Sequence, residues 1–109
     1  MTEREKIKKL MEKHKAIFDV TDMDVAESQK GRWIFTRYND KFGYYDSLIH
    51  FETARELAEI MLGELAMDIF TSIDSEPEDQ PEFHNFADSI EMKASYQPHI
   101  ERLIAYLGK

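Results

Sequence analysis

The amino-acid sequence predicts an α+β fold in which three or four helices pack with a small antiparallel sheet. Apolar residues recur at helical spacing near both ends and in the middle of the chain, and two adjacent segments are rich in β-branched and aromatic residues. The 109 residues, of which 42% are hydrophobic, are enough to build one core. We therefore expect a single domain over residues 1–109.

The first predicted element is an amphipathic helix over residues 3–18. Its apolar side chains follow the i, i+3, i+4, i+7 spacing of one helical face, and lysines dominate the opposite face. The apolar face consists of Ile7, Leu10, Met11, His14, Ile17 and Phe18. Residues 19–31 are polar and show no sustained period, so we expect a loop there that ends in Gly31, with room for a short helical turn at 23–27.

A β-hairpin is predicted next. Residues 32–38 and 44–51 are rich in β-branched and aromatic side chains, and a turn-rich connection that ends in Gly43 separates them. Both faces of the first strand carry bulky groups. The pattern therefore leaves open which face meets the core.

A long helix over residues 54–70 is expected to organise the core, because its apolar arc is wide. Thr53 followed by Glu56 is typical of the capping box that begins a helix. Residues 74–82 hold five acids and two prolines in nine positions, which predicts a solvated loop. A short helix with Pro81 in its first turn can begin near the end of that loop.

The C-terminal part of the chain allows two interpretations. Apolar and polar residues alternate over 89–96, which fits a third strand, whereas the spacing of Phe86 and Ile90 fits a helix. A third strand would stabilise the hairpin, because two strands alone are marginal in water. Both interpretations stay open, and a final helix is predicted over 98–107 with Gly108 at its end.

Charge is distributed unevenly along the chain. Residues 1–50 carry ten Lys and Arg against nine Asp and Glu, whereas residues 51–109 carry four against thirteen, and the formal net charge is −8. Such an acidic protein repels DNA and anionic membranes. The absence of cysteine excludes disulfides and cysteine-ligated metals. The chain shows no secretory signal and no apolar stretch long enough to cross a bilayer, so we expect a cytoplasmic protein.

No motif for catalysis, cofactor binding or metal binding is found in the sequence. No serine lies in a G-x-S-x-G elbow, and the glycines form no phosphate-binding cluster. The histidines do not have the local spacing of metal ligands, and they are His14, His50, His84 and His99. We therefore expect no enzyme, no cofactor and no metal. An enzyme whose site is assembled only in three dimensions is the lowest alternative.

The leading hypothesis is a non-enzymatic module that binds a basic protein through its acidic C-terminal half. Toxin-immunity proteins and phage-borne inhibitors of defence nucleases are also small and acidic, and they use electrostatic complementarity to reach a cationic site. The most concrete partner is thus a nuclease or another nucleic-acid-acting enzyme. The predicted partner-binding residues are Glu56, Glu59, Glu64, Asp68, Asp74, Glu76, Glu78 and Asp79.

The alternative is a nucleic-acid-binding or regulatory module that uses the hairpin region 30–45. Basic and aromatic residues alternate there, and such sheets can stack and track single-stranded nucleic acid. The residues of this alternative are Lys30, Arg32, Arg37, Lys41 and Tyr44. The net negative charge counts against it, so direct nucleic-acid binding is not expected.

Overall fold

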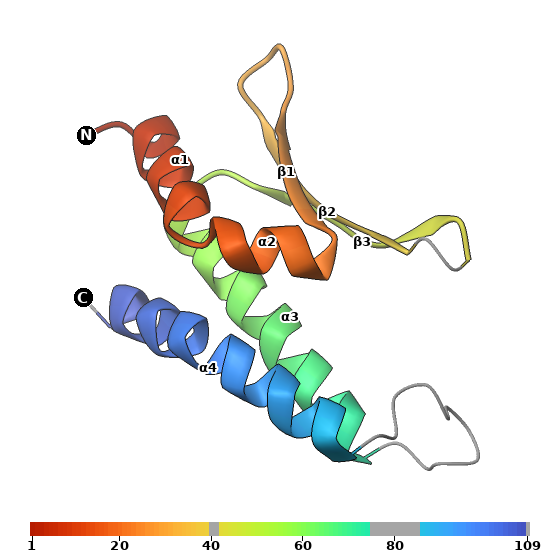
Figure 1. Ribbon diagram of the computed structural model, residues 1–109. Helices are drawn as coiled ribbons and strands as arrows, with labels where there is room; N and C mark the ends of the chain where they lie inside the picture. The colour runs from red at the N-terminus through yellow and green to blue at the C-terminus, as the bar shows by residue number, and fades with distance from the viewer. Residues whose placement is uncertain (40–41, 75–85, 109) are drawn as a thin grey trace. The chain divides into compact units, whose positions relative to one another are not determined.

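The computed structural model describes residues 1–39, 42–74 and 86–108 (Figure 1). This part of the chain holds four α-helices and a three-stranded antiparallel sheet, which confirms the predicted α+β class. The elements are α1 (Glu3–Lys13), α2 (Lys15–Thr21), β1 (Met23–Glu27), β2 (Trp33–Asn39), β3 (Tyr44–Phe51), α3 (Ala54–Asp74) and α4 (Phe86–Leu107). The chain forms two compact units, Met1–Ile60 and Met61–Lys109.

The predicted N-terminal helix is in fact two helices. The Thr2 hydroxyl accepts a hydrogen bond from the Glu5 N–H at 3.2 Å and caps the start of α1. The backbone leaves the helical conformation at His14, whose side chain is completely buried, and α2 then continues to Thr21. The prediction of one helix ending at residue 18 was therefore wrong. The buried residues of α1 and α2 keep the same apolar spacing across His14, so the spacing alone does not reveal the break.

A left-handed residue ends α2 and leads directly into the sheet. Asp22 has φ 58° and ψ 23°, a conformation that aspartate tolerates better than most residues because its short side chain can hydrogen-bond locally. The preceding Thr21 is buried, and its hydroxyl donates to the Ile17 carbonyl at 2.6 Å. The reversal at Asp22 places β1 next to α2 without a long connection.

The predicted loop over 19–31 is wrong for residues 23–27, which form β1. Met23 and Val25 are buried there, while Asp24 and Ala26 are exposed, so the strand does alternate. The option of a strand at 89–96 is also wrong, because these residues belong to α4. The third strand that the hairpin needs comes from upstream of it, not from the C-terminal part.

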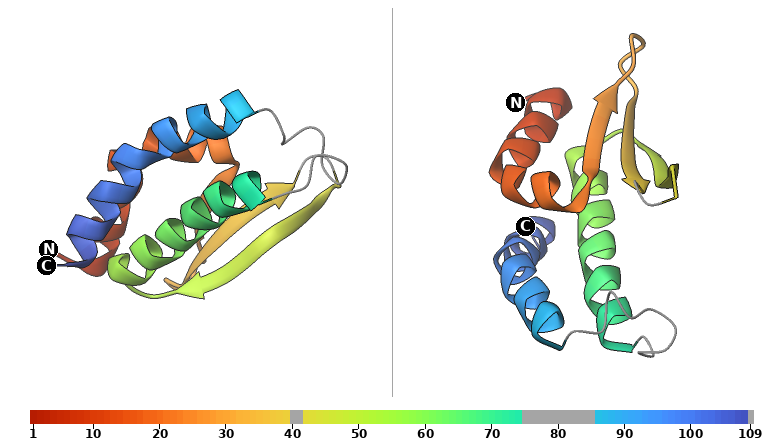
Figure 2. Two further views of the ribbon diagram at one scale, coloured as in Figure 1. Left: turned by 90° about the horizontal axis from the view of Figure 1, so that it is seen from below. Right: turned by 45° about the vertical axis from the view of Figure 1, so that its right-hand side comes forward.

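The sheet has the order β1-β2-β3, with β2 in the centre. Phe35 on β2 lies opposite Val25 on one side and Ile49 on the other, and it is fully buried. Trp33 and Phe35 face the core, which settles the question of orientation that the sequence left open. Ile34, Thr36 and Tyr38 point to the opposite face and are partly or largely exposed. Figure 2 shows the twisted sheet with β1 nearest to α1 and α2.

Thr53 caps the N-terminus of α3 as predicted, but the Glu56 carboxylate bonds the Thr53 hydroxyl and not the Thr53 backbone N–H of a full capping box. The Thr53 hydroxyl accepts a hydrogen bond from the Glu56 N–H at 3.1 Å and donates to the Glu56 carboxylate at 3.3 Å. A second carboxylate joins this helix start from far away in the sequence. Glu3 of α1 accepts a hydrogen bond from the Ala54 N–H at 3.0 Å, so it ties the N-termini of α1 and α3 together.

The Glu3 carboxylate should make stability depend on pH. Its hydrogen bond from the Ala54 N–H, assisted by Lys6, holds the pKa of Glu3 below the ordinary value of a glutamate. A lowered pKa contributes stability above the unfolded-state value of about 4.3 and loses it as pH falls through the folded-state pKa. Urea unfolding from about pH 6 to about pH 3 should therefore show a smaller loss for Glu3→Gln than for the wild type. Equal losses would contradict the role of Glu3.

The second unit consists of the later part of α3 and α4. Met61 and Leu65 of α3 and Leu103 of α4 are completely buried, and the Tyr96 hydroxyl donates to the Asp68 carboxylate at 3.0 Å. In contrast to the predicted helix start at residue 98, Pro98 lies inside α4. A proline there removes one backbone hydrogen bond without ending the helix.

The predicted acidic loop falls largely outside the described residues. Residue 74 ends α3, four residues beyond the predicted helix end at residue 70, and the predicted loop and short helix around Pro81 lie in the part that is not described. Among the described helices, none has the combination of length and apolarity that a membrane crossing requires.

Candidate functional site

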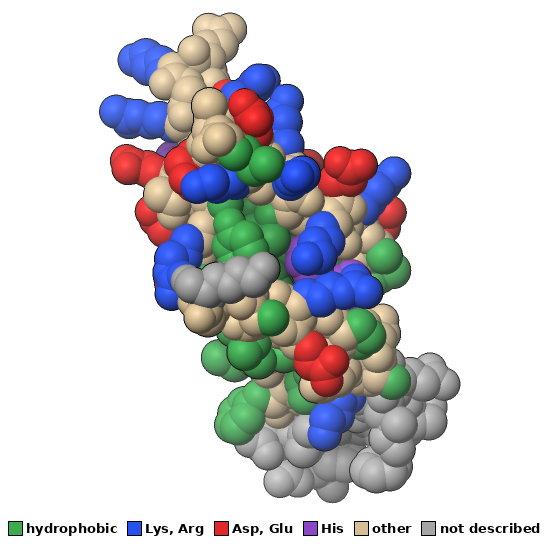
Figure 3. Space-filling model, turned by 90° about the vertical axis from the view of Figure 1, so that its left-hand side faces the viewer, with side chains coloured by type: hydrophobic (Ala, Val, Ile, Leu, Met, Phe, Trp, Pro, Cys, Tyr) green, Lys and Arg blue, Asp and Glu red, His purple; other side chains and the backbone are tan. Residues whose placement is uncertain are grey.

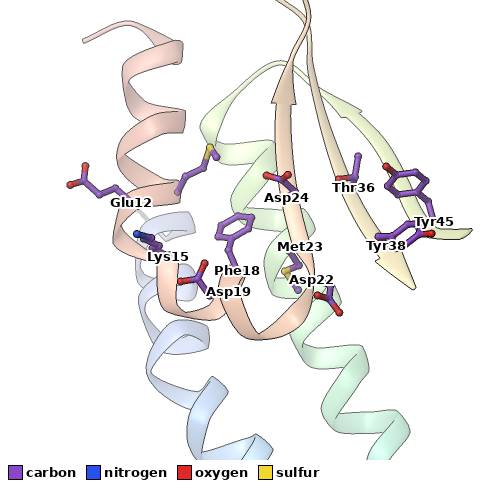
Figure 4. A pocket seen from close by; sticks show the side chains of 11 residues that line it. Glu12, Lys15, Phe18, Asp19, Asp22, Met23, Asp24, Thr36, Tyr38 and Tyr45 are labelled. Atoms are coloured by element: carbon purple, nitrogen blue, oxygen red, sulfur yellow. The ribbon is translucent and has the colours of Figure 1, made fainter. Parts of the chain in front are cut away.

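The first unit contains a pocket of about 660 Å³ that extends from α1 and α2 past β1 to the sheet face that carries Thr36 and Tyr38 (Figure 4). This volume is in the range of sites that bind small molecules or a few side chains of a partner. Residues from α1, α2 and all three strands line it. Five elements thus contribute residues to one pocket, and a short sequence motif could not have predicted it.

The left-handed turn at Asp22 concentrates carboxylates at the pocket. Asp19 lies in the last turn of α2, Asp22 at the turn, and Asp24 on the outward side of β1, and all three line the pocket together with Glu12. Figure 4 shows these acids from the helices and from β1 around a central Phe18. The sequence analysis missed this set, although three aspartates within six residues were a visible signal.

Hydrophobic and aromatic side chains form the rest of the pocket. Met23 is buried, and Met11 and Phe18 are half-buried. On the sheet side, Tyr38 and Tyr45 meet edge to face with ring centroids 5.0 Å apart, and they remain 40% and 51% exposed. Aromatic rings that stay this accessible can still offer their faces to a ligand.

The charges of the pocket are unbalanced. Glu12, Asp19, Asp22 and Asp24 supply four carboxylates, and Lys15 supplies one ammonium group. Asp24 accepts a hydrogen bond from the Val25 N–H at 2.8 Å. Within the described residues, the side chains of the other three acids and of Lys15 form no hydrogen bond or ion pair. A cationic ligand would therefore replace water around the carboxylates of Glu12, Asp19 and Asp22.

The predicted partner-binding residues on α3 form an acidic stripe of Glu56, Glu59, Glu64 and Asp68, and at least three of these four make contacts within the protein. Glu56 belongs to the helix cap, Glu59 forms an ion pair of 3.7 Å with Arg55, and Asp68 accepts the hydrogen bond from Tyr96. Glu64 is half-buried. Glu56 and Glu59 belong to the first unit, and Glu64 and Asp68 to the second. Asp74 ends α3, and the remaining predicted residues, Glu76, Glu78 and Asp79, lie outside the described part.

The four residues of the alternative hypothesis that the structure describes do not converge at one place. Lys30 and Arg32 lie in the connection between β1 and β2, whereas Tyr44 pairs with Asn39 at the far end of β2, about 20 Å away for a strand of this length. Tyr44 stacks on Phe42 with ring centroids 5.9 Å apart. Arg37 donates from Nε to the Thr21 carbonyl at 3.1 Å. Lys41 is outside the described residues.

Charges of both signs are interspersed on the face that carries α1. Figure 3 shows Lys and Arg side chains among Asp and Glu side chains there, with hydrophobic side chains between them. In the sequence, residues 1–60 are close to neutral, with eleven Lys and Arg against twelve Asp and Glu, whereas residues 61–109 carry three against ten. The acidic pocket is therefore a local feature of a nearly neutral unit.

No group of three or more histidine, aspartate or glutamate side chains in the described part of the chain is arranged to hold a metal ion. Comparison with protein-family models, with curated proteins and with solved structures finds no match to this chain. The chemistry of the pocket residues is thus what points to a function.

Proposed function

We propose that the protein is a non-enzymatic binding module that takes a basic segment of a partner protein in the pocket of its first unit. One observation carries this proposal: four carboxylates and only one ammonium group line the pocket, together with Phe18, Tyr38 and Tyr45. In its most concrete form the partner is a nuclease or another nucleic-acid-acting enzyme, and the module covers its cationic groove as an inhibitor or immunity-type protein.

An arginine side chain suits this pocket better than other groups. Its planar guanidinium can donate two parallel hydrogen bonds to a carboxylate and can also stack on an aromatic face. A cation over a tyrosine ring gains about 0.5–2 kcal/mol, depending on how far it is desolvated. The aliphatic stem of the same side chain can lie on Met11 and Phe18, which are half-buried at the pocket.

The strongly acidic sequence of residues 61–109 supports the same class of partner in a different way. A net negative charge attracts a basic protein over roughly a Debye length and raises the association rate, even where the charges form no contact in the complex. The pocket would then supply short-range contacts that retain the partner. If long-range attraction and pocket contacts have these separate roles, acids outside the pocket should affect mainly the association rate, and acids in the pocket mainly the dissociation rate.

The proposal is tested with a fluorescein-labelled peptide that alternates arginine and glycine, measured by fluorescence polarisation. Asp19→Asn combined with Asp22→Asn should weaken binding roughly tenfold or more, which corresponds to about 1.4 kcal/mol. Asparagine tolerates the left-handed conformation at position 22, so the fold should be retained.

The matched control is Glu52→Gln combined with Glu59→Gln. It removes the same charge from exposed positions of the same unit that do not line the pocket. We expect its affinity to stay within about twofold of wild type, as for peripheral charges at moderate salt. If both double variants weaken binding equally, the peptide senses only net charge, and the pocket is not the binding site.

A further inference from the structure

β3 is an edge of the sheet, and it is the longest and most exposed of the three strands. In the described part of the chain it pairs only with β2. Of its eight residues, only Phe51 at its end is buried. Leu48 is 58% exposed and Ile49 is 38% exposed, in the middle of the strand. This edge therefore offers both apolar side chains and backbone groups to another strand.

Within the part of the chain that the structure describes, most of β3 lacks the usual protections of an edge strand. Natural edges are blocked by lysine, proline, bulges or covering segments, because unpaired backbone groups otherwise recruit a further strand. The sequence of β3 contains neither lysine nor proline. A bulge interrupts its pairing with β2 only near Tyr45 and Asp46, and the pairing from Ser47 to Phe51 is regular.

The order of side chains along β3 is complementary to itself. When two copies of the strand run antiparallel about a two-fold axis at Leu48, each Leu48 faces its counterpart. Each Ser47 then faces an Ile49, and each His50 lies opposite the bulge at Asp46, whose carboxylate accepts a hydrogen bond from the Asn39 amide at 3.2 Å. The His50 ring can donate a hydrogen bond to the Asp46 carboxylate whether it is neutral or charged. No two like charges are opposed along the strand in this register.

We propose that β3 pairs with β3 of a second copy of this chain, so that two sheets join into one of six strands. The proposal does not rest on the pocket, because Leu48 and His50 do not line it. The contact is one strand wide, so we expect a reversible dimer of the weak class. Main-chain hydrogen bonds supply its affinity, and the Leu48 contact fixes its register.

The test is sedimentation velocity of the full chain over a concentration series. The wild type should approach twice the monomer mass as the concentration rises towards about 100 µM, which is typical of weak association. Leu48→Lys should weaken association at least tenfold, because it places two cations opposite each other at the axis. Val20→Lys, which adds the same charge at an exposed apolar position of α2, should dimerise like the wild type.

A mixture of two oppositely charged variants tests whether Leu48→Lys acts at the dimer contact itself and not by disturbing the fold. Leu48→Lys and Leu48→Glu should each be monomeric alone and should form a heterodimer when mixed, because opposite charges then meet at the axis. A wild type that stays monomeric throughout the series would overturn the proposal and leave the edge for a strand of another protein. A dimer that Leu48→Lys leaves intact, or a mixture that stays monomeric, would likewise overturn it.

Discussion

Phe35→Ala should lower the free energy of unfolding by about 3–5 kcal/mol, the cost of truncating a buried aromatic side chain. Phe35 is completely buried at the centre of the sheet, where it lies between Val25 and Ile49 of the neighbouring strands. Removing its ring leaves a cavity that strands held by ladders on both sides cannot readily close. The loss is a large share of the roughly 5–15 kcal/mol by which domains are stable.

Urea unfolding followed by circular dichroism measures this effect. The control is Tyr44→Ala on the same sheet, because Tyr44 is 53% exposed and should cost well under half as much. If the two substitutions were equally costly, Phe35 would not be the centre of the core.

Leu65→Ala should lower the free energy of unfolding by about 2–5 kcal/mol, the range for a buried leucine. Leu65 on α3 is completely buried, whereas Met67 two residues further on is 60% exposed. Met67→Ala is therefore the matched control, and it should change stability by less than about 1 kcal/mol. The reverse order of the two effects would mean that α3 is rotated and that its acidic stripe faces inward.

The fold class and the best-defined elements could be predicted from sequence because their patterns are strong. The aromatic and β-branched run of the hairpin and the wide apolar arc of α3 each exceed the length at which periodicity becomes informative. β1 was missed because it has only five residues, two of which are acids. The alternation over 89–96 fits a helix as well as a strand, and the position of Pro98 suggested a helix start where a helix in fact continues.

The pocket could not be predicted in the same way, since it joins residues as distant as Glu12, Asp24 and Tyr45. Periodicity reports which residues share one face of one element, and it therefore favoured the stripe on α3. It does not report which carboxylates are already used. Contacts with Arg55 and Tyr96, which occupy two of these acids, become visible only in three dimensions.

The most direct test of the proposed function is to map where a basic peptide binds. Amide correlation spectra of the isotope-labelled protein, titrated with the arginine-glycine peptide, report all backbone positions except the prolines at once. We expect the largest shifts at Phe18, Asp19, Asp22, Asp24 and Tyr45, and their loss in the combined Asp19→Asn and Asp22→Asn variant. Shifts confined to residues 61–109, unchanged in that variant, would contradict the proposal and assign the basic partner to the acidic C-terminal half.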